Sequence, residues 1–371
     1  MASNLETWLK KGNAVISPKI AVQDIPGRGR SVISTQAITP GTQLVVIRRR
    51  QLLNKLSIKV TCPKWTPHWN KLNSHQILAL VITLYCNDAD NYWYPFLSQL
   101  PTKESFQGIP LGMTPEDLKS MPLSVQSHVS KQKNTFLDDF EAVKRVLSDS
   151  DSETNIEYNE FLRAWMCVNS RCLYMTLPGS DGTPADNMTM APFIDFLNHT
   201  SLGEQDSVKV DVTAVGMVVT ARKHYSPGDE ILLGYGPHDN TFLLCEYGFT
   251  IPSNPWDTVD ITQEILQLLT TSQKSVLEEL GYLGDYTVNK EGPSFRTEVS
   301  LSCLQEPSSD GIPPGLQMLC SGRSDGSKYK TGNCRVLQQI LETKSRELAR
   351  LPLNDVTRGM LEITNALTNE K

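Results

Sequence analysis

Cysteine is sparse in this sequence, and its positions show no pairing. Eight cysteines occur among 371 residues, and no two of them form a Cys-x-x-Cys motif. Structural zinc sites usually combine two such motifs, so we expect no metal site. The thiols are instead expected to be reduced and buried in the core of a cytoplasmic or nuclear protein.

Long apolar segments are absent as well. No run approaches the ~18 apolar residues of a membrane span, and residues 1–11 lack the apolar stretch of a secretory signal peptide. The sequence therefore predicts a protein of the cytoplasm, the nucleus or both, without a membrane partner. In those compartments the glycosylation sequons at Asn187 and Asn198 would have no role.

The chain also lacks an excess of basic residues. The chain contains 35 Lys+Arg and 41 Asp+Glu, which gives a formal net charge of −6. A protein that coats nucleic acid would be basic overall, so no nucleic-acid partner is predicted. The charge is nevertheless uneven, because residues 1–60 contain ten basic and two acidic residues. The acidic remainder could attract a lysine-rich protein.

Four stretches of different character follow one another along the chain. Residues 14–60 have the pattern of short strands, residues 61–165 that of helices, residues 166–252 contain further strands, and residues 255–371 are mainly helical. The prolines of Pro252-Ser-Asn-Pro255 interrupt both helix and strand and mark a domain boundary. Apolar spacing predicts helices over 74–85, 124–147, 156–172, 261–283 and 336–348, and a short strand over 297–304.

Two short segments of the chain could form a binding site. One is a glycine-rich turn beside a predicted strand, and the other is an apolar run that carries polar residues. The turn Gly27-Arg28-Gly29-Arg30 could be an ordinary hairpin turn, or its glycines could let backbone amides approach a cofactor closely. The apolar run Ala191 to Thr200 carries Asp195, Asn198 and His199. Buried polar groups need partners, which a structural network or a bound polar ligand could supply.

A third piece contains two tyrosines, each followed by glycine. Tyr235 lies in Gly-Tyr-Gly, and Tyr247 begins Tyr-Gly-Phe249. Tyrosine combines an apolar face with a hydrogen-bonding tip. Such residues can line a narrow channel for a long amine, and they can equally be core aromatics.

In this order and spacing, the three pieces resemble the SET domain of protein lysine methyltransferases. Pro227-Gly-Asp-Glu230 also matches a turn of that family. The helical insertion, the helical tail and the lack of a cysteine cluster after residue 250 look like the branch of Rubisco large-subunit and ribosomal-protein lysine methyltransferases.

The resemblance implies an α+β fold, in which a β-rich SET fold is split by a helical insertion and followed by a mainly helical C-terminal substrate-binding domain. The SET fold would comprise residues 14–60 and 166–252. The insertion would comprise residues 61–165, and the C-terminal domain residues 255–371.

The resemblance also implies roles for individual residues. Tyr235 would be the catalytic tyrosine. The residues that bind S-adenosylmethionine would be Gly27, Arg28, Gly29, Ser170, Asn198, His199 and Tyr235. The target lysine would be bound by Arg171, Asp195, Tyr247 and Phe249. No metal is implied.

These residue types suit methyl transfer from a sulfonium to an amine. The reaction is an in-line displacement that needs a neutral amine aimed at the methyl carbon, so positioning supplies much of the rate. A tyrosine hydroxyl and backbone carbonyls can orient the amine. Aromatic walls can hold the alkyl chain and tolerate the cationic product.

The sequence therefore predicts an S-adenosylmethionine-dependent protein-lysine N-methyltransferase. It would act as a monomer on a non-histone protein, such as a ribosomal protein. One alternative is a SET-fold module that binds a peptide or partner with weak or no activity, and another is a histone-lysine methyltransferase. Pro26 and Arg30 favour the binding module, because relatives often carry an acidic or polar residue before the turn and an aliphatic residue after it. The intact Tyr235, Asn198 and His199 argue against that module.

Overall fold

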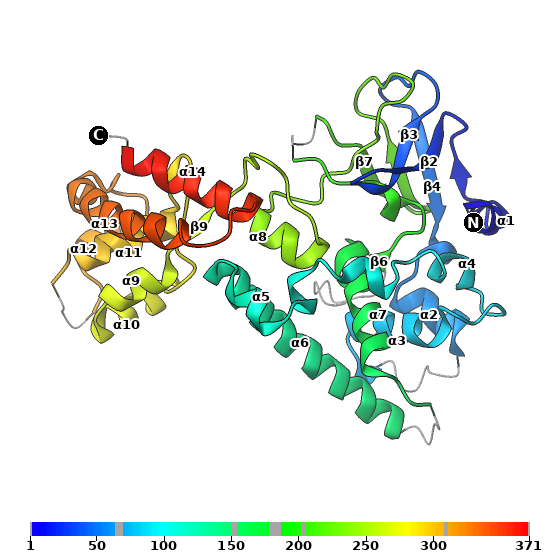
Figure 1. The fold of residues 1–371 in the computed structure, drawn as a ribbon, viewed down its shortest axis with the longest axis horizontal. Coiled ribbons are helices and arrows are strands. Elements are labelled where there is room, and N and C mark those ends of the chain that lie inside the picture. Colours follow the sequence, from blue (N-terminus) through cyan, green and yellow to red (C-terminus); the bar gives the residue numbers. More distant parts are fainter. Residues whose placement is uncertain are drawn as a thin grey trace. The chain divides into compact units, whose positions relative to one another are not determined.

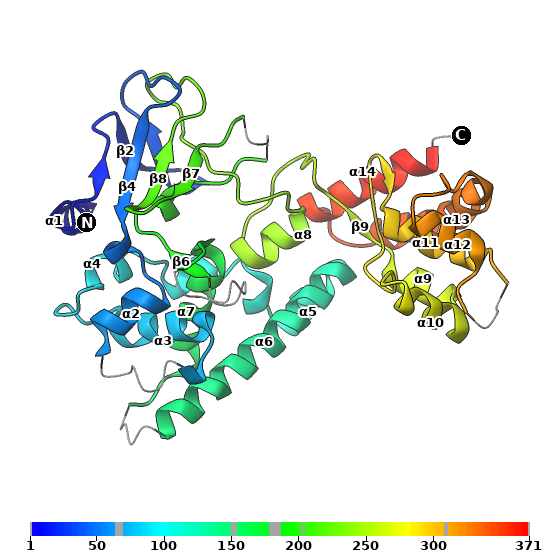
Figure 2. The same ribbon diagram turned by 180° about the vertical axis from the view of Figure 1, so that it is seen from behind.

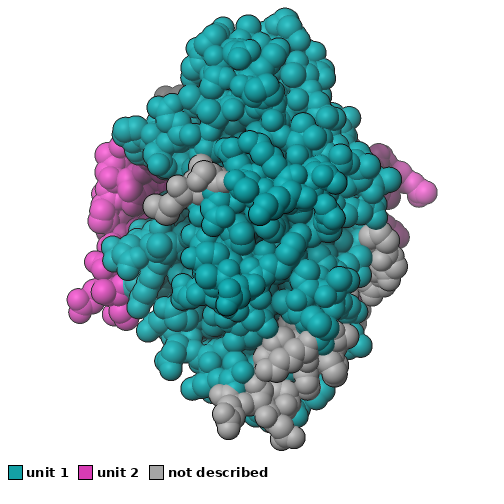
Figure 3. Space-filling view, turned by 90° about the vertical axis from the view of Figure 1, so that its right-hand side faces the viewer, with its two compact units in different colours: residues 1–113, 129–237, 246–248 teal, residues 114–128, 238–245, 249–371 magenta. Residues whose placement is uncertain are grey.

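The structure is a computed structural model that describes residues 2–63, 70–149, 154–177, 187–201, 203, 205–307 and 311–369 (Figure 1). The chain forms two compact units (Figure 3). The first unit comprises residues 1–113, 129–237 and 246–248. The second unit comprises residues 114–128, 238–245 and 249–371.

Helices and small sheets occur in both units, which confirms the predicted α+β class. The helices are α1 (Ala2–Lys11), α2 (Lys55–Thr61), α3 (Ser74–Tyr85), α4 (Tyr94–Leu97), α5 (Pro115–Lys119), α6 (Leu123–Ser148), α7 (Tyr158–Arg171), α8 (Asn240–Phe242), α9 (Thr262–Leu268), α10 (Thr271–Glu279), α11 (Phe295–Leu304), α12 (Pro314–Cys320), α13 (Lys330–Leu348) and α14 (Asp355–Asn369). The strands are β1 (Val15–Ile16), β2 (Ile20–Ile25), β3 (Gly29–Ser34), β4 (Gln43–Arg48), β5 (Cys172–Tyr174), β6 (Met188–Met190), β7 (Lys209–Val212), β8 (Gly216–Thr220), β9 (Val259–Asp260), β10 (Thr287–Asn289) and β11 (Gly292–Pro293).

The first unit contains a four-stranded antiparallel sheet with the strand order β1-β4-β8-β7. Strands β2 and β3 form a separate hairpin, and β5 pairs with β6. Figures 1 and 2 show β2, β4 and β7 gathered at one end of this unit, and α2, α3 and α7 at the other. The close approach of β4 and β8 requires glycine at position 216, since its φ is +144° and a Cβ would lie 1.9 Å from the carbonyl oxygen of Ile47.

Helix α3 lies in the core of the helical part of this unit and packs against α7. Asn73 caps it by accepting a hydrogen bond from the backbone N–H of Gln76. The run from Ile77 to Ile82 is buried on every side of the helix. Full burial of one such large apolar side chain stabilises a fold by roughly 1.5–3 kcal/mol, so α3 holds the helical part together.

Most predicted helices agree with the structure, with boundaries shifted by a few residues. The segments 74–85, 124–147, 156–172 and 336–348 correspond to α3, α6, α7 and α13. The predicted helix over 261–283 is two helices, α9 and α10. Thr270 begins the second one by forming a capping box with Gln273.

The strand predicted over residues 297–304 is wrong, because this segment belongs to helix α11. Ser294 caps the helix by accepting from the backbone N–H of Thr297. Nearly every residue from Thr297 to Cys303 is buried, so the helix shows no polar face that would mark a period of 3.6. Its serine hydroxyls bond within the helix, as Ser302 does to the carbonyl oxygen of Glu298 (2.7 Å).

None of the helices in the described ranges has the length and apolarity to span a membrane. Within the same residues, His, Cys, Asp and Glu side chains form no group that could hold a metal ion. The eight cysteines all lie in the described residues and form no disulfide, and five of them are buried.

Candidate active site

Residues 229–233 bring the three pieces of the sequence together. On one side this segment pairs with β3, because the N–H of Ser34 donates to the carbonyl of Asp229 (2.9 Å) and that of Ile231 donates to Val32 (2.8 Å). On the other side, the N–H of Leu233 donates to the carbonyl of Asn198 (2.8 Å). Backbone pairing therefore places the glycine turn before β3, the Asn198-His199 pair and Tyr235 in one region.

Asn198 is held by side chains from two of these segments. Its Nδ2 donates to Oγ of Ser31 on β3 (2.8 Å) and to Oε1 of Glu230 (2.9 Å). The second carboxylate oxygen of Glu230 forms an ion pair with Nη1 of Arg28 (2.9 Å). Both amide donors of Asn198 are thus used, and what Asn198 can offer to a ligand is its carbonyl oxygen.

The Gly27-Arg28-Gly29 turn exposes its backbone. The φ angles of Gly27 and Gly29 are +77° and +70°, a region that favours glycine. A Cβ at either position would meet no described atom within 4 Å, so this face of the turn has room for a ligand. Arg30 does not occupy that space. Its guanidinium lies 4.6 Å from the ring centroid of Phe196 and donates to the carbonyl of Gln99 (3.2 Å).

Tyr235 is fixed at both its backbone and its hydroxyl. Its backbone N–H donates to Nδ1 of His199 (3.0 Å), and its hydroxyl donates to the carbonyl oxygen of Leu197 (2.8 Å). The rings of His199 and Tyr235 lie 5.1 Å apart. Burial raises the pKa of the Tyr235 hydroxyl well above its usual value. Tyr235 is therefore a neutral phenol at physiological pH, which can position a substrate by hydrogen bonding.

A partly buried ion pair lies at the end of α7. Nη1 of Arg171 donates to the carbonyl oxygen of Asp195 (2.9 Å) and lies 3.3 Å from its Oδ2. The Asp195 side chain is 2% exposed, and its Oδ1 has no hydrogen-bond partner among the described residues. Burial raises the pKa of this carboxyl, against the opposing charges of Arg171 and Arg30. Phe193, two residues earlier, has a strained φ of +72° and leads into the 3₁₀ turn Ile194–Phe196 that carries Asp195.

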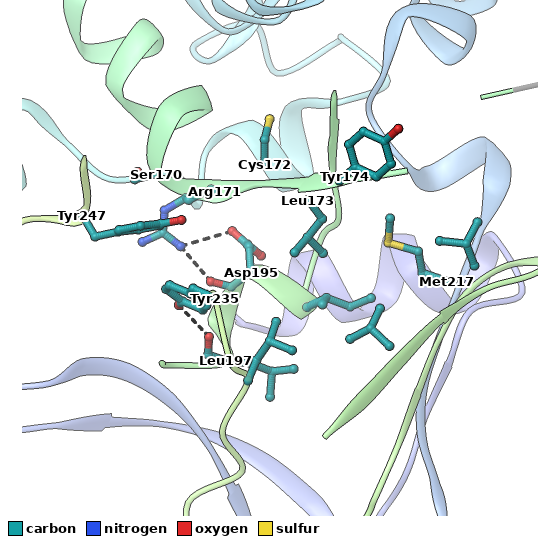
Figure 4. A pocket seen from close by; sticks show the side chains of 15 residues that line it. Ser170, Arg171, Cys172, Leu173, Tyr174, Asp195, Leu197, Met217, Tyr235 and Tyr247 are labelled. Carbon is teal, nitrogen blue, oxygen red and sulfur yellow. Dashed lines mark hydrogen bonds and ion pairs between the residues drawn. The ribbon is translucent and has the colours of Figure 1, made fainter. Parts of the chain in front are cut away.

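Several of these side chains line a cavity of about 250 Å³ (Figure 4). Figure 4 shows Arg171, Asp195, Tyr235 and Tyr247 at one end of it and the apolar Leu173 and Met217 further along. The rings of Tyr235 and Tyr247 lie 5.0 Å apart, and burial raises the pKa of the Tyr247 hydroxyl to about 12. A cavity with a polar end and apolar walls suits an alkyl chain that ends in an amine.

The cavity contains part of the residue set that the sequence predicts. Its lining includes the predicted residues Ser170, Arg171, Asp195, Tyr235 and Tyr247. The glycine turn joins this region through the contacts of Arg28, Glu230 and Asn198. Phe249 is not among the lining residues and is grouped with the second unit. The hydroxyl of Ser170 donates to the carbonyl of Met166 in its own helix (2.8 Å).

Sequence reasoning missed the strand residues of this cavity. They are Cys172, Leu173, Tyr174, Val210, Val212 and Met217. Nothing in their types distinguishes them from ordinary strand residues. The alternation of Val208, Val210 and Val212 could have placed two valines on one face, but not beside Tyr235.

The chain matches two family models. Residues 29–236 match the SET domain, and residues 257–360 match the ribosomal lysine N-methyltransferase 2 C-terminal domain. The first match covers more than half of the chain, so the chain belongs to the SET-domain family.

Named relatives align with most of the chain. Ribosomal lysine N-methyltransferase set11 from Schizosaccharomyces pombe is 29% identical, and the alignment covers 91% of this chain and 85% of that protein. Ribosomal lysine N-methyltransferase 2 from Saccharomyces cerevisiae is 28% identical, with 80% and 81% covered. SET domain-containing protein 4 from Mus musculus is 26% identical, with 81% and 72% covered.

Solved structures confirm the fold. The SET domain of LSMT bound to lysine and AdoHcy superposes with a TM-score of 0.70 at 11% identity, covering 99% of this chain and 89% of that one. Rubisco LSMT bound to AdoMet superposes with a TM-score of 0.68 at 12% identity, covering 99% and 88%. The predicted SET fold and its helical C-terminal region are therefore confirmed.

The family match and the relatives also define the activity. The chain is a protein-lysine N-methyltransferase that uses S-adenosylmethionine, as its sequence predicts. It is therefore an enzyme and not a SET-fold module that only binds a partner.

The described residues fit this cofactor. The amino-acid part of S-adenosylmethionine carries an ammonium group that donates hydrogen bonds and a carboxylate that accepts them. The carbonyl oxygen of Asn198 can accept from the ammonium, and the open backbone of the Gly27–Gly29 turn can approach the ligand closely. When bound, the cofactor supplies a methyl group activated by its positive sulfur.

Proposed function

We propose that this enzyme methylates a lysine of a ribosomal protein. Two of its relatives are named ribosomal lysine N-methyltransferases, and residues 257–360 match the C-terminal domain of one such enzyme. The charge distribution supports a basic partner, because the chain beyond residue 60 contains 25 basic and 39 acidic residues.

The cavity beside Tyr235 is the proposed lysine site, and one observation carries this assignment. Tyr235, whose hydroxyl is fixed by the Leu197 carbonyl, and Asp195, whose buried Oδ1 has no partner among the described residues, both line a cavity with apolar walls. The walls would hold the lysine chain and exclude water. The Oδ1 of Asp195 can accept a hydrogen bond from the amine, and Arg171 keeps Asp195 in place.

Tyr235 is the proposed catalytic residue. Its raised pKa keeps the hydroxyl neutral, and its bond to the Leu197 carbonyl fixes its direction. The hydroxyl can therefore orient the neutral amine by hydrogen bonding. The faces of Tyr235 and Tyr247 favour the methylated ammonium product. Because the reaction depends on alignment, this fixed geometry is the main contribution of the chain to the rate.

The remaining site residues have proposed roles in binding. Gly27, Arg28, Gly29, Ser170, Asn198 and His199 would bind the cofactor, together with Tyr235. Phe249 would contact the substrate. Asn198 has the most specific support, because Ser31 and Glu230 fix the orientation of its amide.

The substrate proposal can be tested by methyl transfer in vitro. The purified enzyme is incubated with methyl-labelled S-adenosylmethionine and either ribosomal proteins or histone octamers, both from cells that lack this enzyme. We expect a labelled lysine in a ribosomal protein, identified by mass spectrometry, and strongly reduced label with the Tyr235→Phe variant. Label in histones alone would contradict the proposal and favour the histone alternative.

We further propose that the protein is a monomer located in the cytoplasm, the nucleus or both. Ribosomal proteins are accessible in these compartments before and during assembly. Light scattering after gel filtration should give the mass of a single 41.4 kDa chain. Fluorescence microscopy of a tagged chain should show it in these compartments, and a signal confined to another organelle would contradict this location.

A further inference from the structure

Glu246 stands immediately before Tyr247, in a short π-helical turn that spans Leu243–Tyr247. Turns of this type are rare and frequently occur at functional sites. The Oε2 atom of Glu246 accepts a hydrogen bond from Nδ2 of Asn169 and another from Nε2 of Gln132 (3.1 Å). Glu246 thus joins the turn to helices α7 and α6.

The residues that follow Glu246 and Asn169 in the chain line the lysine cavity. Tyr247 follows Glu246 and lines the cavity, and Ser170 and Arg171 follow Asn169 and line it as well. Figure 4 shows Tyr247 and Arg171 next to each other at the end of the cavity that holds Tyr235. The contact between Glu246 and Asn169 therefore joins two walls of the cavity through residues that do not line it.

Buried polar contacts at another position of α6 join it to α7 and α3 as well. Gln132 and Asp139 are both 6% exposed on α6. Asp139 accepts hydrogen bonds from Nε1 of Trp165 (2.8 Å) and from Nε2 of Gln76 (2.7 Å), so α6 is joined to α7 and α3. Networks of this kind hold helices in one register when their members are satisfied.

A partly buried carboxylate contributes little net stability by itself, because removing its charge from water costs free energy. Well-packed apolar residues at such a position are often neutral or stabilising by comparison. The directional bonds of Glu246 provide something that an apolar contact does not, which is a fixed distance between Tyr247 and the end of α7.

We propose that Glu246 is a positioning residue that holds Tyr247 against the end of α7 and thereby sets the space left for the lysine amine and its methyl groups. The inference rests on the proposed function, since it takes the cavity beside Tyr235 as the lysine site. If the walls separate, the amine loses its alignment, and a more heavily methylated amine gains room.

Variants of the two joined residues test this. Asn169→Asp places a second carboxylate against Glu246, so the contact becomes repulsive. Adding Glu246→Gln to that variant restores the bond to residue 169 with donor and acceptor exchanged, in side chains of unchanged shape. The amide of Gln132, which donates to the same Oε2 in the wild type, turns to present its oxygen. Glu246→Ala removes the contact. Glu160→Gln is the matched control, because Glu160 lies on α7 with its side chain 52% exposed and pairs only loosely with Arg163 (3.6 Å).

Three quantities are measured for each variant on ribosomal proteins from cells that lack the enzyme. They are kcat, the ratio of mono- to di- and trimethyl-lysine by mass spectrometry, and the dissociation constant of S-adenosylmethionine by calorimetry. In Asn169→Asp and Glu246→Ala we expect kcat to fall by about 10- to 100-fold, as small misplacements near a reacting group do. The methylation ratio should shift toward the higher states. The cofactor constant should change by no more than about twofold, since the bonds of Glu246 to Asn169 and Gln132 lie on α7 and α6 and not on the glycine turn.

The double variant Asn169→Asp/Glu246→Gln should recover kcat and the wild-type methylation ratio, and Glu160→Gln should match the wild type. Failure of the double variant to recover would overturn the proposal, and so would a wild-type kcat and ratio in Glu246→Ala. Because the double variant keeps the native shape, it decides the question even if Glu246→Ala does not fold.

Hydrogen exchange separates this proposal from the substrate assignment. If the wild type transfers no methyl groups to ribosomal proteins, that assignment fails on its own. Backbone amides in 168–172 and 246–248 should still exchange faster in Asn169→Asp and return to the wild-type rate in the double variant. Equal exchange in all the variants would overturn the positioning role.

Discussion

His75 should make the first unit sensitive to acid. The imidazole lies on α3 with 14% of its side chain exposed, and its ring centroid is 4.8 Å from that of Trp165. Its Nδ1 lies 3.9 Å from Oδ2 of Asp139, a carboxylate already bonded to Trp165 and Gln76. Burial lowers the pKa of His75 from 6.5 to about 4, against the opposing charges of Asp139 and Glu246.

The sign and size of the effect follow from this pKa. As the pH falls, the unfolded chain takes up a proton on His75 near pH 6.5, whereas the folded chain resists protonation until about pH 4. The stability that the neutral His75 contributes is therefore fully present above pH 6.5. It is lost as the pH falls from about 6.5 to about 4. At about 1.36 kcal/mol per pKa unit, the folded state should lose about 2.5 kcal/mol from this residue between about pH 7 and about pH 4.5.

Urea unfolding measured at several pH values tests this expectation. Tryptophan fluorescence is a suitable probe, because Trp165 contacts His75. The free energy of unfolding of the wild type should fall more with acid than that of His75→Gln. Between about pH 7 and about pH 4.5 the two losses should differ by about 2.5 kcal/mol. His224→Gln, which removes an exposed imidazole, is the control and should follow the wild type. Parallel curves for the wild type and His75→Gln between about pH 6.5 and about pH 4 would refute the reasoning.

Three further predictions concern single residues of the first unit. Tyr235→Phe should lower kcat by about 10²- to 10³-fold, the usual effect of losing a group that orients charge in a transition state. It should leave cofactor affinity, measured by calorimetry, largely intact, because only the hydroxyl is lost. Asn198→Ala should weaken S-adenosylmethionine binding by about 5- to 150-fold, because it removes a polar partner worth roughly 1–3 kcal/mol. Gly216→Ala should lower the free energy of unfolding by more than about 3 kcal/mol, since its Cβ would meet the carbonyl oxygen of Ile47 at 1.9 Å. Gly41→Ala, where φ is +82° and no described atom lies near the new Cβ, should cost only about 1 kcal/mol of backbone strain.

Each of these results can contradict its premise. An unchanged kcat in Tyr235→Phe would remove the catalytic role of its hydroxyl. An unaltered dissociation constant in Asn198→Ala would count against cofactor binding by the Asn198-His199 pair. Equal losses of unfolding free energy in Gly216→Ala and Gly41→Ala would show that the close approach of β4 and β8 does not determine the loss in Gly216→Ala.

Local patterns were sufficient for much of the secondary structure. Apolar spacing located α3, α6, α7 and α13, because apolar residues in each segment recur every three to four positions. The same rule failed for α11, where Val299, Leu301 and Cys303 alternate with Ser300 and Ser302 as in a strand. The fold buries these serines as well, and their hydroxyls bond within the helix, which the segment alone could not reveal.

The candidate site shows the same division. The residue types of Asn198, His199 and Tyr235 and their order were visible in the sequence, because each is a polar residue in an apolar or glycine-rich setting. Phe249 was predicted from the resemblance to the family, and it is not among the residues that line the cavity.

The sequence by itself determined the family, the cofactor class and the chemistry, since these depend on which residues occur and in what order. Only the tertiary structure decided how residues 229–233 lie between β3 and Asn198, and that Leu173, Val210 and Met217 complete the cavity. It alone placed Glu246 against Asn169, 77 positions away in the chain. The physical reason is that such contacts form between segments whose local sequences do not depend on one another, so only the folded chain brings them within hydrogen-bonding distance.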